Sequence, residues 1–494
     1  MTRSRRDFIG NVAAVTTGLV VPWGDAFANA DAYGQSHGNY NSTGRPLRGY
    51  GPLRHDPAQV LDLPDGFSYR VISRAGDAMD DGLRVPGLAD GMHAFRVGMD
   101  TVLVRNHELN VGDRDHAFRA QRKIAAEHLA KLYDGRVGTG GTTTVVLAAD
   151  GLSVRRQFLS LAGTLRNCAG GATPWGSWLS CEESVVRLGQ HGALRDHGYV
   201  FEVPAAAKEL TDPHPLKAMG RFHREAVAVD PNLGVVYQSE DRADGLFYRF
   251  IPEQRGQLSA GGRLQAMVIE GFDGHSTANR RQRIDVASSR QVPARKRLPV
   301  SWVDLDEVES PHDDLRQRGR ALGATTFFRG EGFTVQRTSE GVCVWFVCTA
   351  GGPRGLGQIW CYRPAAGDTA VGPLAAKEQE TMELFLQPEH ASMLRNGDNL
   401  AMAPTDDVLV CEDQPDRQRL MGVTSDGGVY LLARNPRGDS ELAGACFARR
   451  PDSGAVSGTA KGRDGEVLYL NIQRRGLTLA ITGPWSSRDA SAQR

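Results

Sequence analysis

The chain of 494 residues has no excess of either charge sign. Lysine and arginine together number 58, and aspartate and glutamate together also number 58. A protein with zero formal net charge has no overall field that draws it to nucleic acid or to an anionic membrane surface. We therefore expect no nucleic-acid partner, and function must depend on local chemistry.

A long apolar run is missing as well. The most apolar stretch, residues 12–21, is interrupted by Thr16, Thr17 and Gly18 and is followed by Pro22. A helix needs about 20 apolar residues to cross a bilayer. We therefore expect no permanent membrane anchor.

Paired cysteine motifs and long helical patterns are also scarce. The seven cysteines are scattered without a Cys-x-x-Cys pattern, at positions 168, 181, 343, 348, 361, 411 and 446. Because seven is odd, at least one thiol has no disulfide partner within the chain. Glycine, by contrast, is abundant at 58 residues, which favours a turn-rich, mostly β protein. Helical spacing of apolar residues predicts one exception, over residues 118–133.

The N-terminus has the pattern of an export signal. Arg5 and Arg6 precede the modestly apolar stretch, and this order is typical of a twin-arginine leader. The small-x-small pattern at residues 26–28 predicts cleavage of a signal peptide, residues 1–28, so that Asn29 begins the mature chain. We expect export of the folded protein by the twin-arginine translocase to the periplasm or beyond. A disordered, basic N-terminus is the alternative interpretation.

Short strand-like runs recur along the chain and end in acidic or amide side chains. Five runs follow this rule, at residues 102–104, 178–179, 235–237, 408–410 and 467–470, and a sixth run, 342–348, ends in Thr-Ala-Gly-Gly. Behind four runs comes a second, aromatic strand opened by glycine, at 198–201, 245–248, 357–360 and 428–431. Such a repeat is typical of propeller blades. We predict an all-β fold, a six-bladed β-propeller with inserted loops and a few helices, whose inner strands carry these polar ends to a central channel. A β-sandwich or a mixed α/β fold is the alternative.

The remaining segments fit around this repeat. We expect a single propeller domain over residues 29–485, and a monomer. The polar segment 271–324, which is rich in arginine and then acidic, is interpreted as an inserted loop region with a short helix near residues 313–322. Residues 486–494 are expected to form a disordered tail.

Carboxylates crowded into one channel favour bound cations. They cannot all remain ionised by themselves, because like charges raise one another's pKa. Hard oxygen ligands suit Ca²⁺ and ferric iron, whereas a lone cysteine suits a transition metal. The densest segment is residues 166–183, where a glycine-rich loop carrying Cys168 leads to a strand that ends in Glu182 and Glu183. From the residues alone, a buried small residue is the more frequent role of such a cysteine.

This segment resembles the PhoX-type alkaline phosphatases. The resemblance rests on Asn-Cys-Ala-Gly-Gly at 167–171, Thr-Pro-Trp-Gly at 173–176 and Cys-Glu-Glu at 181–183, and it continues along most of the mature chain. It implies a six-bladed propeller with a cluster of Fe³⁺ and Ca²⁺ at the channel mouth. It also implies hydrolysis of small-molecule phosphomonoesters by attack of a metal-bridging oxo or hydroxide group, without a phosphorylated side chain.

The resemblance also implies roles for individual residues. The implied iron ligands are Cys168, Glu225 and Glu331. The implied calcium ligands are Glu182, Glu183 and Glu412, with Asn106 and Glu108 as weaker candidates. Arg329 stands two residues before Glu331, is expected on the same face of a strand, and is the implied phosphate clamp and catalytic residue.

Two positions depart from the family pattern. Arg224 stands where a histidine usually precedes the glutamate, and Arg474 and Arg475 replace a His-Pro pair after Asn-Ile-Gln. Both departures are expected to alter the surroundings of the metals or the phosphate site. Two functions from other classes stay open: a calcium-only propeller hydrolase acting on lactones or similar esters, and a catalytically silent ligand-binding propeller.

Overall fold

The computed structural model describes residues 39–40, 46–47, 49–121, 123–280, 290–365, 379–450 and 465–485. The predicted leader, its cleavage site and the tail 486–494 lie outside these residues. Within them, no helix is both long enough and apolar enough to cross a membrane.

The described chain is mainly β and forms antiparallel meanders, in which strands that follow one another in sequence pair side by side. The first meander contains β6 (Ala89–Val97), β7 (Asp100–His107), β8 (Gly140–Leu147) and β9 (Val154–Thr164). The second contains β10 (Asn167–Ala172), β11 (Ser177–Glu182) and β12 (Val200–Pro204).

A ten-stranded sheet follows and contains two meanders joined edge to edge. One consists of β13 (Arg224–Val229), β14 (Val236–Glu240), β15 (Gly245–Pro252), β16 (Gly262–Ile269) and β17 (Arg297–Leu305). The other consists of β19 (Gly330–Thr338), β20 (Gly341–Cys348), β21 (Gln358–Arg363) and β22 (Thr381–Leu386). Strand β17 pairs with β22 and thereby joins them, while the short β18 (Thr326–Phe327) pairs with β15.

The last meanders bring the two ends of the described chain together. One contains β23 (Gly397–Met402), β24 (Val408–Glu412), β25 (Arg419–Val423) and β26 (Val429–Arg434), with β1 (Asn39–Tyr40) and β2 (Pro46–Leu47) added at its edge. The other contains β27 (Leu442–Arg449), β28 (Glu466–Ile472), β29 (Leu477–Thr482) and the early strand β5 (Ser68–Arg74). A separate pair is formed by β3 (Leu53–Arg54) and β4 (Leu63–Pro64).

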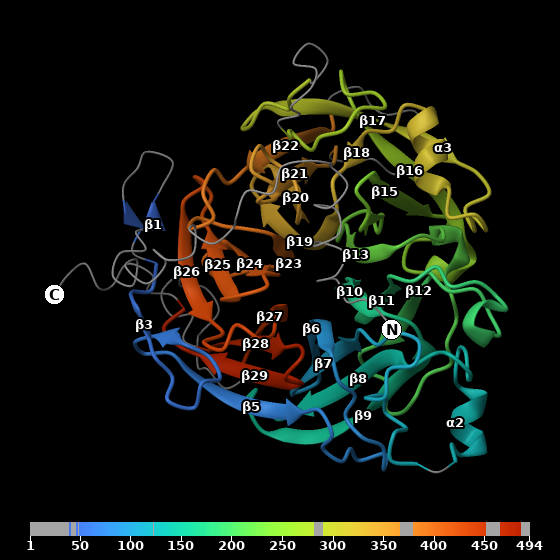
Figure 1. Ribbon diagram of the computed structural model, residues 1–494. Coiled ribbons are helices and arrows are strands. Elements are labelled where there is room, and N and C mark those ends of the chain that lie inside the picture. Colours follow the sequence, from blue (N-terminus) through green and yellow to red (C-terminus); the bar gives the residue numbers. More distant parts are fainter. Residues whose placement is uncertain are drawn as a thin grey trace, which may run out of the picture.

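The meanders radiate around a common centre (Figure 1). The first strand of each one lies innermost, and these strands contact one another in a closed ring in the order β6, β10, β13, β19, β23, β27 and back to β6. Hydrophobic clusters fill the space between neighbouring meanders, as where Phe247 of β15 packs against Phe346 of β20. The fold is therefore propeller-like, with a ring of inner strands around its axis.

The strand runs predicted as inner strands are second strands instead. They correspond to β7, β11, β14, β20, β24 and β28, each one position outward from the ring. The strands that form the ring escaped the hydrophobicity pattern because several are built from small residues. In β10, for example, a Cβ atom on Gly171 would lie 2.2 Å from the carbonyl oxygen of Val227 in β13. Close approach of backbones around the axis requires such residues.

Each inner strand has a bulge at the same place. In β10, the partner of Asn167 is Glu182 and the partner of Gly170 is Ser180, so that one extra residue is inserted in the inner strand. The same shift occurs in the other five inner strands. In each bulge two residues of the inner strand lie opposite one residue of its partner, and we call the first of these two the first inserted residue. The first inserted residues are Asp90, Cys168, Glu225, Glu331, Asp398 and Gly444.

Two predictions about local structure need correction. The helix expected over residues 118–133 is only α2 (Ala126–Ala130), and its Leu129 is 45% exposed. Phe118 and Tyr133 pack in two different hydrophobic clusters, so the apolar residues at helical spacing do not share one face. The segment 271–324 is not simply a loop, because β17 within it belongs to the ten-stranded sheet.

The short helix expected near residues 313–322 is present as α3 (Leu315–Ala321). Within the described residues, the other helical turns are η2 (Gln190–Gly192), η3 (Lys217–Met219) and η4 (Leu258–Ala260).

Candidate metal centre

Potential metal ligands gather on the bulges of the inner strands. Among the described residues, four groups of three such side chains have ligand atoms within 4.8 Å of one another, and neighbouring groups share Cys168, Glu225 or Asp398. The groups therefore form one continuous chain of side chains, which we call the bulge cluster. Its members are Asp90, Glu108, Cys168, Glu183, Glu225, Glu331, Asp398, Asp413 and Glu441.

The bulges explain why these side chains converge. A bulge redirects a side chain out of the regular alternation of a strand, and the closed ring brings the redirected residues of successive meanders together. Five members of the cluster are first inserted residues, whereas Glu108, Glu183 and Asp413 directly follow the ends of β7, β11 and β24. Most members are buried, while Asp413 and Glu441 are partly exposed. Repetition of one local backbone feature thus builds the site.

The sixth bulge position holds a glycine for a steric reason. Gly444 has a φ of +61°, and a Cβ atom there would lie 2.2 Å from the carbonyl oxygen of Asp90. The backbone of Asp90 therefore occupies the place of a side chain at Gly444. The last meander contributes Glu441, which lies just before β27, to the cluster instead.

Of the adjacent pair Glu182 and Glu183, only the second lies in the bulge cluster. The carboxylate of Glu182 accepts hydrogen bonds from Nδ1 of His197 at 2.6 Å and from the backbone N–H groups of Leu165 and Gly198, both at 2.8 Å. Successive residues of a strand point to opposite sides. Glu182 therefore supports the surrounding loops, and its expected role as a calcium ligand does not fit its position.

Glu412 and Asp413 repeat this division. Glu412 pairs with Arg419 at 2.6 Å and accepts from the backbone N–H of Arg395 at 2.8 Å, while burial raises its pKa. Its neighbour Asp413 lies in the bulge cluster. The potential metal ligand at this strand end is thus Asp413, one residue after the expected Glu412.

The side chain of Asn106 makes hydrogen bonds to the chain around Cys168. Its amide nitrogen donates to the carbonyl oxygens of Cys168 and Ala169, at 3.2 and 2.7 Å. Its amide oxygen accepts from Trp178 and Ser180, at 2.8 and 2.9 Å. Asn106 therefore holds the backbone of the bulge that carries Cys168, and its expected role as a ligand stays a prediction.

Sequence reasoning missed Asp90, Asp398, Asp413 and Glu441. A detectable signal existed for two of them, because Asp398 stands 15 residues before Asp413, the same spacing that separates Cys168 from Glu183. The underlying pattern is a potential ligand that stands about one hairpin before an acidic strand end. Nothing comparable in the sequence marks Glu441.

Two arginines of the described chain contact the bulge cluster. Arg329 forms a bidentate pair with Asp241, at 2.7 and 2.8 Å, and its Nη2 lies 3.2 Å from Oε1 of Glu331. Arg166 lies 3.1 Å from Glu108 and 3.2 Å from Glu183. Arg329 precedes β19 and has a φ of +59°, so it approaches Glu331 from a turn and not from the same face of a strand, as the sequence had suggested.

Neither departure from the family pattern enters the bulge cluster. The guanidinium of Arg224 is buried and donates to Gln238 and to the carbonyl oxygens of Gly198, Met219 and Gly220, and burial lowers its pKa to about 10. Arg475 donates to the backbone of Gln59 at an exposed position. The preceding Gln473, by contrast, donates to Asp90 and Glu108, at 3.0 and 2.8 Å.

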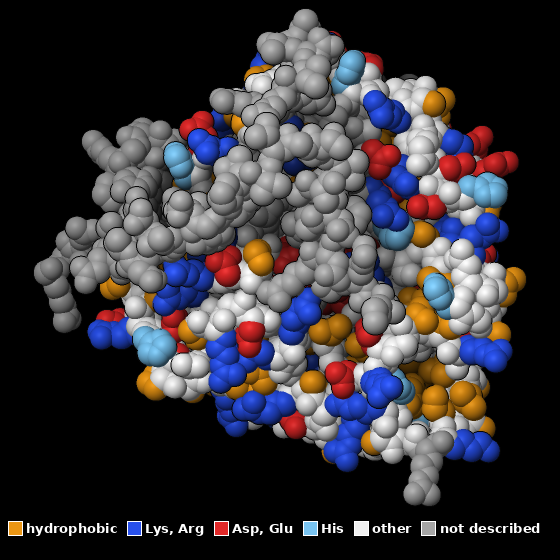
Figure 2. Space-filling view, in the orientation of Figure 1, with side chains coloured by type: hydrophobic (Ala, Val, Ile, Leu, Met, Phe, Trp, Pro, Cys, Tyr) orange, Lys and Arg blue, Asp and Glu red, His pale blue; other side chains and the backbone are white. Residues whose placement is uncertain are grey.

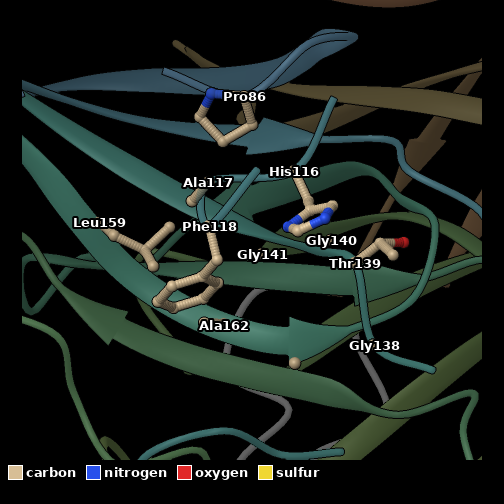
Figure 3. A pocket seen from close by; sticks show the side chains of 11 residues that line it. Pro86, His116, Ala117, Phe118, Gly138, Thr139, Gly140, Gly141, Leu159 and Ala162 are labelled. Carbon is tan, nitrogen blue, oxygen red and sulfur yellow. The ribbon is translucent and has the colours of Figure 1, made fainter. Parts of the chain in front are cut away.

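A small cavity lies elsewhere and has a different character. It is lined by Pro86, His116, Phe118, Leu159 and several glycines and alanines, and by no member of the bulge cluster (Figure 3). Its volume of about 10 Å³ corresponds to room for about one water molecule. The coloured part of the surface in Figure 2 carries both acidic and basic side chains, as the balanced composition suggests.

Comparison with solved structures gives only weak likenesses. They include a gluconolactonase from Xanthomonas campestris, with 11% identity over 89% of this chain and 99% of that chain and a TM-score of 0.34. A catalytically inactive virginiamycin B lyase from Staphylococcus aureus has 10% identity over 84% of this chain and 99% of that chain, with a TM-score of 0.35. A luciferin-regenerating enzyme has 9% identity over 85% of this chain and 96% of that chain, with a TM-score of 0.39. Likenesses at this level carry no argument about function.

Comparison at the level of sequence is decisive. No curated protein matches the chain. Residues 48–476, however, match the family described as alkaline phosphatase PhoX. This match spans all nine members of the bulge cluster as well as Arg166 and Arg329. The chain therefore belongs to the PhoX alkaline phosphatase family, and this membership makes it a phosphomonoesterase.

Proposed function

We propose that this protein is an exported, monomeric, metal-dependent phosphatase that hydrolyses small-molecule phosphomonoesters at the bulge cluster. Family membership supplies the reaction class. The observation that carries the location is the continuous chain of ligand groups, in which Cys168, Glu225 and Asp398 are each shared by two groups. Shared ligands of this kind suit several metal ions held side by side.

The residues present fit bound cations. The cluster contains eight carboxyl groups, and Arg166 and Arg329 bring two positive charges to it. Buried carboxylates without compensation are costly, since each loses its hydration. Multivalent cations would offset this cost, so the donor set supports a metal centre.

Chemistry of the donors suggests where each ion would bind. Cys168 is the soft donor, and we assign it to iron together with Glu225 and Glu331. Oxygen donors suit calcium, and we assign Asp90, Glu108, Glu183, Asp398, Asp413 and Glu441 to calcium. This set replaces Glu182, Glu412 and Asn106, whose polar atoms have other partners.

The chain's own residues would then position the substrate. A phosphomonoester is dianionic and is hydrolysed extremely slowly without a catalyst. When bound, the metal ions would supply Lewis acidity to the phosphoryl oxygens and the leaving oxygen. Arg329, which is fixed by its bidentate pair with Asp241, would donate to a phosphoryl oxygen from the rim of the cluster. Arg329 is therefore the proposed catalytic arginine.

The finer description of the fold is also a proposal. We infer six blades, in which the ten-stranded sheet counts as two because β17 and β22 join separate meanders. Support comes from the recurrence of the same bulge in β6, β10, β13, β19, β23 and β27.

Export by the twin-arginine route is proposed from the leader sequence. A disulfide between Cys343 and Cys361 in neighbouring strands β20 and β21 is in keeping with an oxidising compartment. Replacing Arg5 and Arg6 by lysine should leave the precursor in the cytoplasm, because the translocase distinguishes guanidinium groups from amines. Cell fractionation would locate the protein, and normal export of this double variant would contradict the proposal.

Substitution of Cys168 tests the proposed function. Cys168→Ser replaces a soft ligand with a poor one, so iron content and turnover of a phosphomonoester should fall together in a protein that still folds. Cys446→Ser is the matched control, since Cys446 is also buried but lies outside the bulge cluster. It should retain iron and turnover per folded molecule.

Metal analysis of the wild-type protein separates the remaining alternatives. Iron with calcium and phosphatase turnover supports the proposal. Calcium alone, with turnover of a lactone, would indicate a calcium-only hydrolase. Calcium without any turnover would indicate a silent propeller, and wild-type iron content in Cys168→Ser would remove Cys168 from the ligand set.

A further inference from the structure

The bulge repeat extends to a position outside the strands. The residue concerned stands two positions before the first inserted residue of the inner strand. Its backbone carbonyl oxygen accepts a hydrogen bond from the backbone N–H of the residue that directly follows the second strand of the same meander. This bond joins Leu88 to Glu108, Arg166 to Glu183, His223 to Asp241, Arg329 to Thr349 and Asn396 to Asp413, at 2.9 to 3.1 Å. We call the five residues whose carbonyl groups accept these bonds the rim positions. They are Leu88, Arg166, His223, Arg329 and Asn396.

Arg166 and Arg329 occupy equivalent rim positions. Both have a positive φ, +49° for Arg166 and +59° for Arg329, and each lies two residues before a bulge residue of the cluster. Equivalent backbone conformations in equivalent meanders aim their side chains in equivalent directions relative to the axis. The two guanidinium groups are therefore related by the internal repeat, with one meander between them.

The contacts of the two arginines correspond in part, because Glu108 and Asp241 each follow the second strand of the preceding meander. Arg329 touches Glu331 and Asp241, and Arg166 touches Glu183 and Glu108, so each guanidinium joins carboxylates contributed by two different strands or strand ends. The Arg166 side chain is 23% exposed and that of Arg329 is 14% exposed. Each guanidinium thus borders the cluster while keeping access to solvent.

Glu183 connects Arg166 to the rim residue that lies between the two arginines. The backbone of Glu183 donates to the carbonyl oxygen of Arg166, and its own carbonyl oxygen lies 3.2 Å from Nδ1 of His223, the rim residue between them. Glu183 and Glu331 both belong to groups that contain Glu225. Arg166 and Arg329 therefore border the part of the cluster centred on Glu225 from two sides.

We propose that Arg166 is a second oxyanion-binding residue, which holds a phosphoryl oxygen from the side opposite Arg329. The inference rests on the proposed phosphatase function and adds to it a residue for which the family resemblance implied no role. A guanidinium presents two parallel donors that match phosphate oxygens. Two such groups around one tetrahedral anion fix its orientation, which a single arginine does not.

Binding of inorganic phosphate to the metal-loaded mature protein tests this role directly. Calorimetry should show roughly 10- to 100-fold weaker binding for Arg166→Gln, because charge-assisted hydrogen bonds are lost. Arg166→Lys should bind with intermediate affinity, since it keeps the charge and loses the second donor. Arg242→Gln is the matched control and should bind like the wild type, because the contacts of Arg242 are to His223 and Asp313.

The contrary outcomes are distinct. Wild-type phosphate affinity in Arg166→Gln would overturn the proposal. So would a loss of iron or calcium in step with phosphate binding, because Arg166 would then only support the carboxylates. If Arg166→Gln does not fold, wild-type affinity in Arg166→Lys is the overturning result. Failure of the proposed function would appear separately, as wild-type protein that binds metals and phosphate but does not turn over an ester.

Discussion

Neighbouring carboxylates on the second strands differ in role because they face opposite ways. Glu183 lies in the bulge cluster, whereas Glu182 accepts hydrogen bonds from His197 and from backbone N–H groups. We predict that Glu183→Gln lowers metal content and, when both proteins are compared free of metal, leaves the free energy of unfolding close to that of the wild type. Glu182→Gln should lower the free energy of unfolding by about 3 kcal/mol, since it leaves a buried partner uncompensated. Metal analysis and urea unfolding of both variants would check this, and the reverse assignment would contradict it.

His197 gives the protein a pH dependence of stability. Burial lowers its pKa, but the carboxylates of Glu182 and Asp134 outweigh this effect and raise the pKa overall. A histidine whose pKa is raised on folding stabilises the fold fully when the pH is below the pKa of the unfolded state, near 6.5. This contribution is lost as the pH rises through the pKa of the folded state. Thermal unfolding of His197→Gln between pH 6 and pH 9 should therefore show a smaller decline with pH than the wild type. An unchanged decline would contradict the assignment.

At the scale of the element, the bulge at Gly444 is predicted to tolerate no side chain. Gly444→Ala would place a Cβ atom 2.2 Å from the Asp90 carbonyl oxygen at a φ of +61°, and should cost more than about 3 kcal/mol. Gly176 is the matched control, because it has a φ of +89° but a Cβ atom added there would meet no other atom within 4 Å. Gly176→Ala should cost only about 1–2 kcal/mol of backbone strain. Equal losses in chemical denaturation would show that strain alone accounts for Gly444.

The second strands could be predicted from sequence, and the inner strands could not. Runs such as Val408–Val410 are buried on both faces and are rich in β-branched and leucine residues, which makes them visible. The inner strand β10 reads Asn-Cys-Ala-Gly-Gly-Ala, and its bulge breaks the alternation on which strand prediction depends. Cys168, Glu225 and Glu331 were identified through the family resemblance. Asp90 and Glu441 became visible only once the ring brought distant residues together.

Removal of metals is predicted to affect the whole molecule. Members of the bulge cluster come from successive meanders around the ring, so their mutual repulsion without cations would act between neighbouring meanders from the first to the last. A chelator should therefore lower both the midpoint of thermal unfolding and the rate of phosphomonoester hydrolysis, and added calcium should restore the midpoint. Unchanged thermal stability in protein shown to be free of metal would contradict the cluster.

Closure of the ring also sets the order in which the protein can mature. The first ligand of the cluster in sequence, Asp90, is held by Asn471 and Gln473, at 2.6 and 3.0 Å, and β5 pairs with the final strand β29. These partners stand 381 and 383 residues after Asp90 in the chain, so they are synthesised much later than the first meander. Earlier meanders can form during synthesis, but the environment of Asp90 exists only after residues 471 and 473 have been synthesised. A chain terminated before residue 471 therefore lacks a finished first meander as well as a last one, and every step that requires the closed ring has to follow synthesis of the last meander.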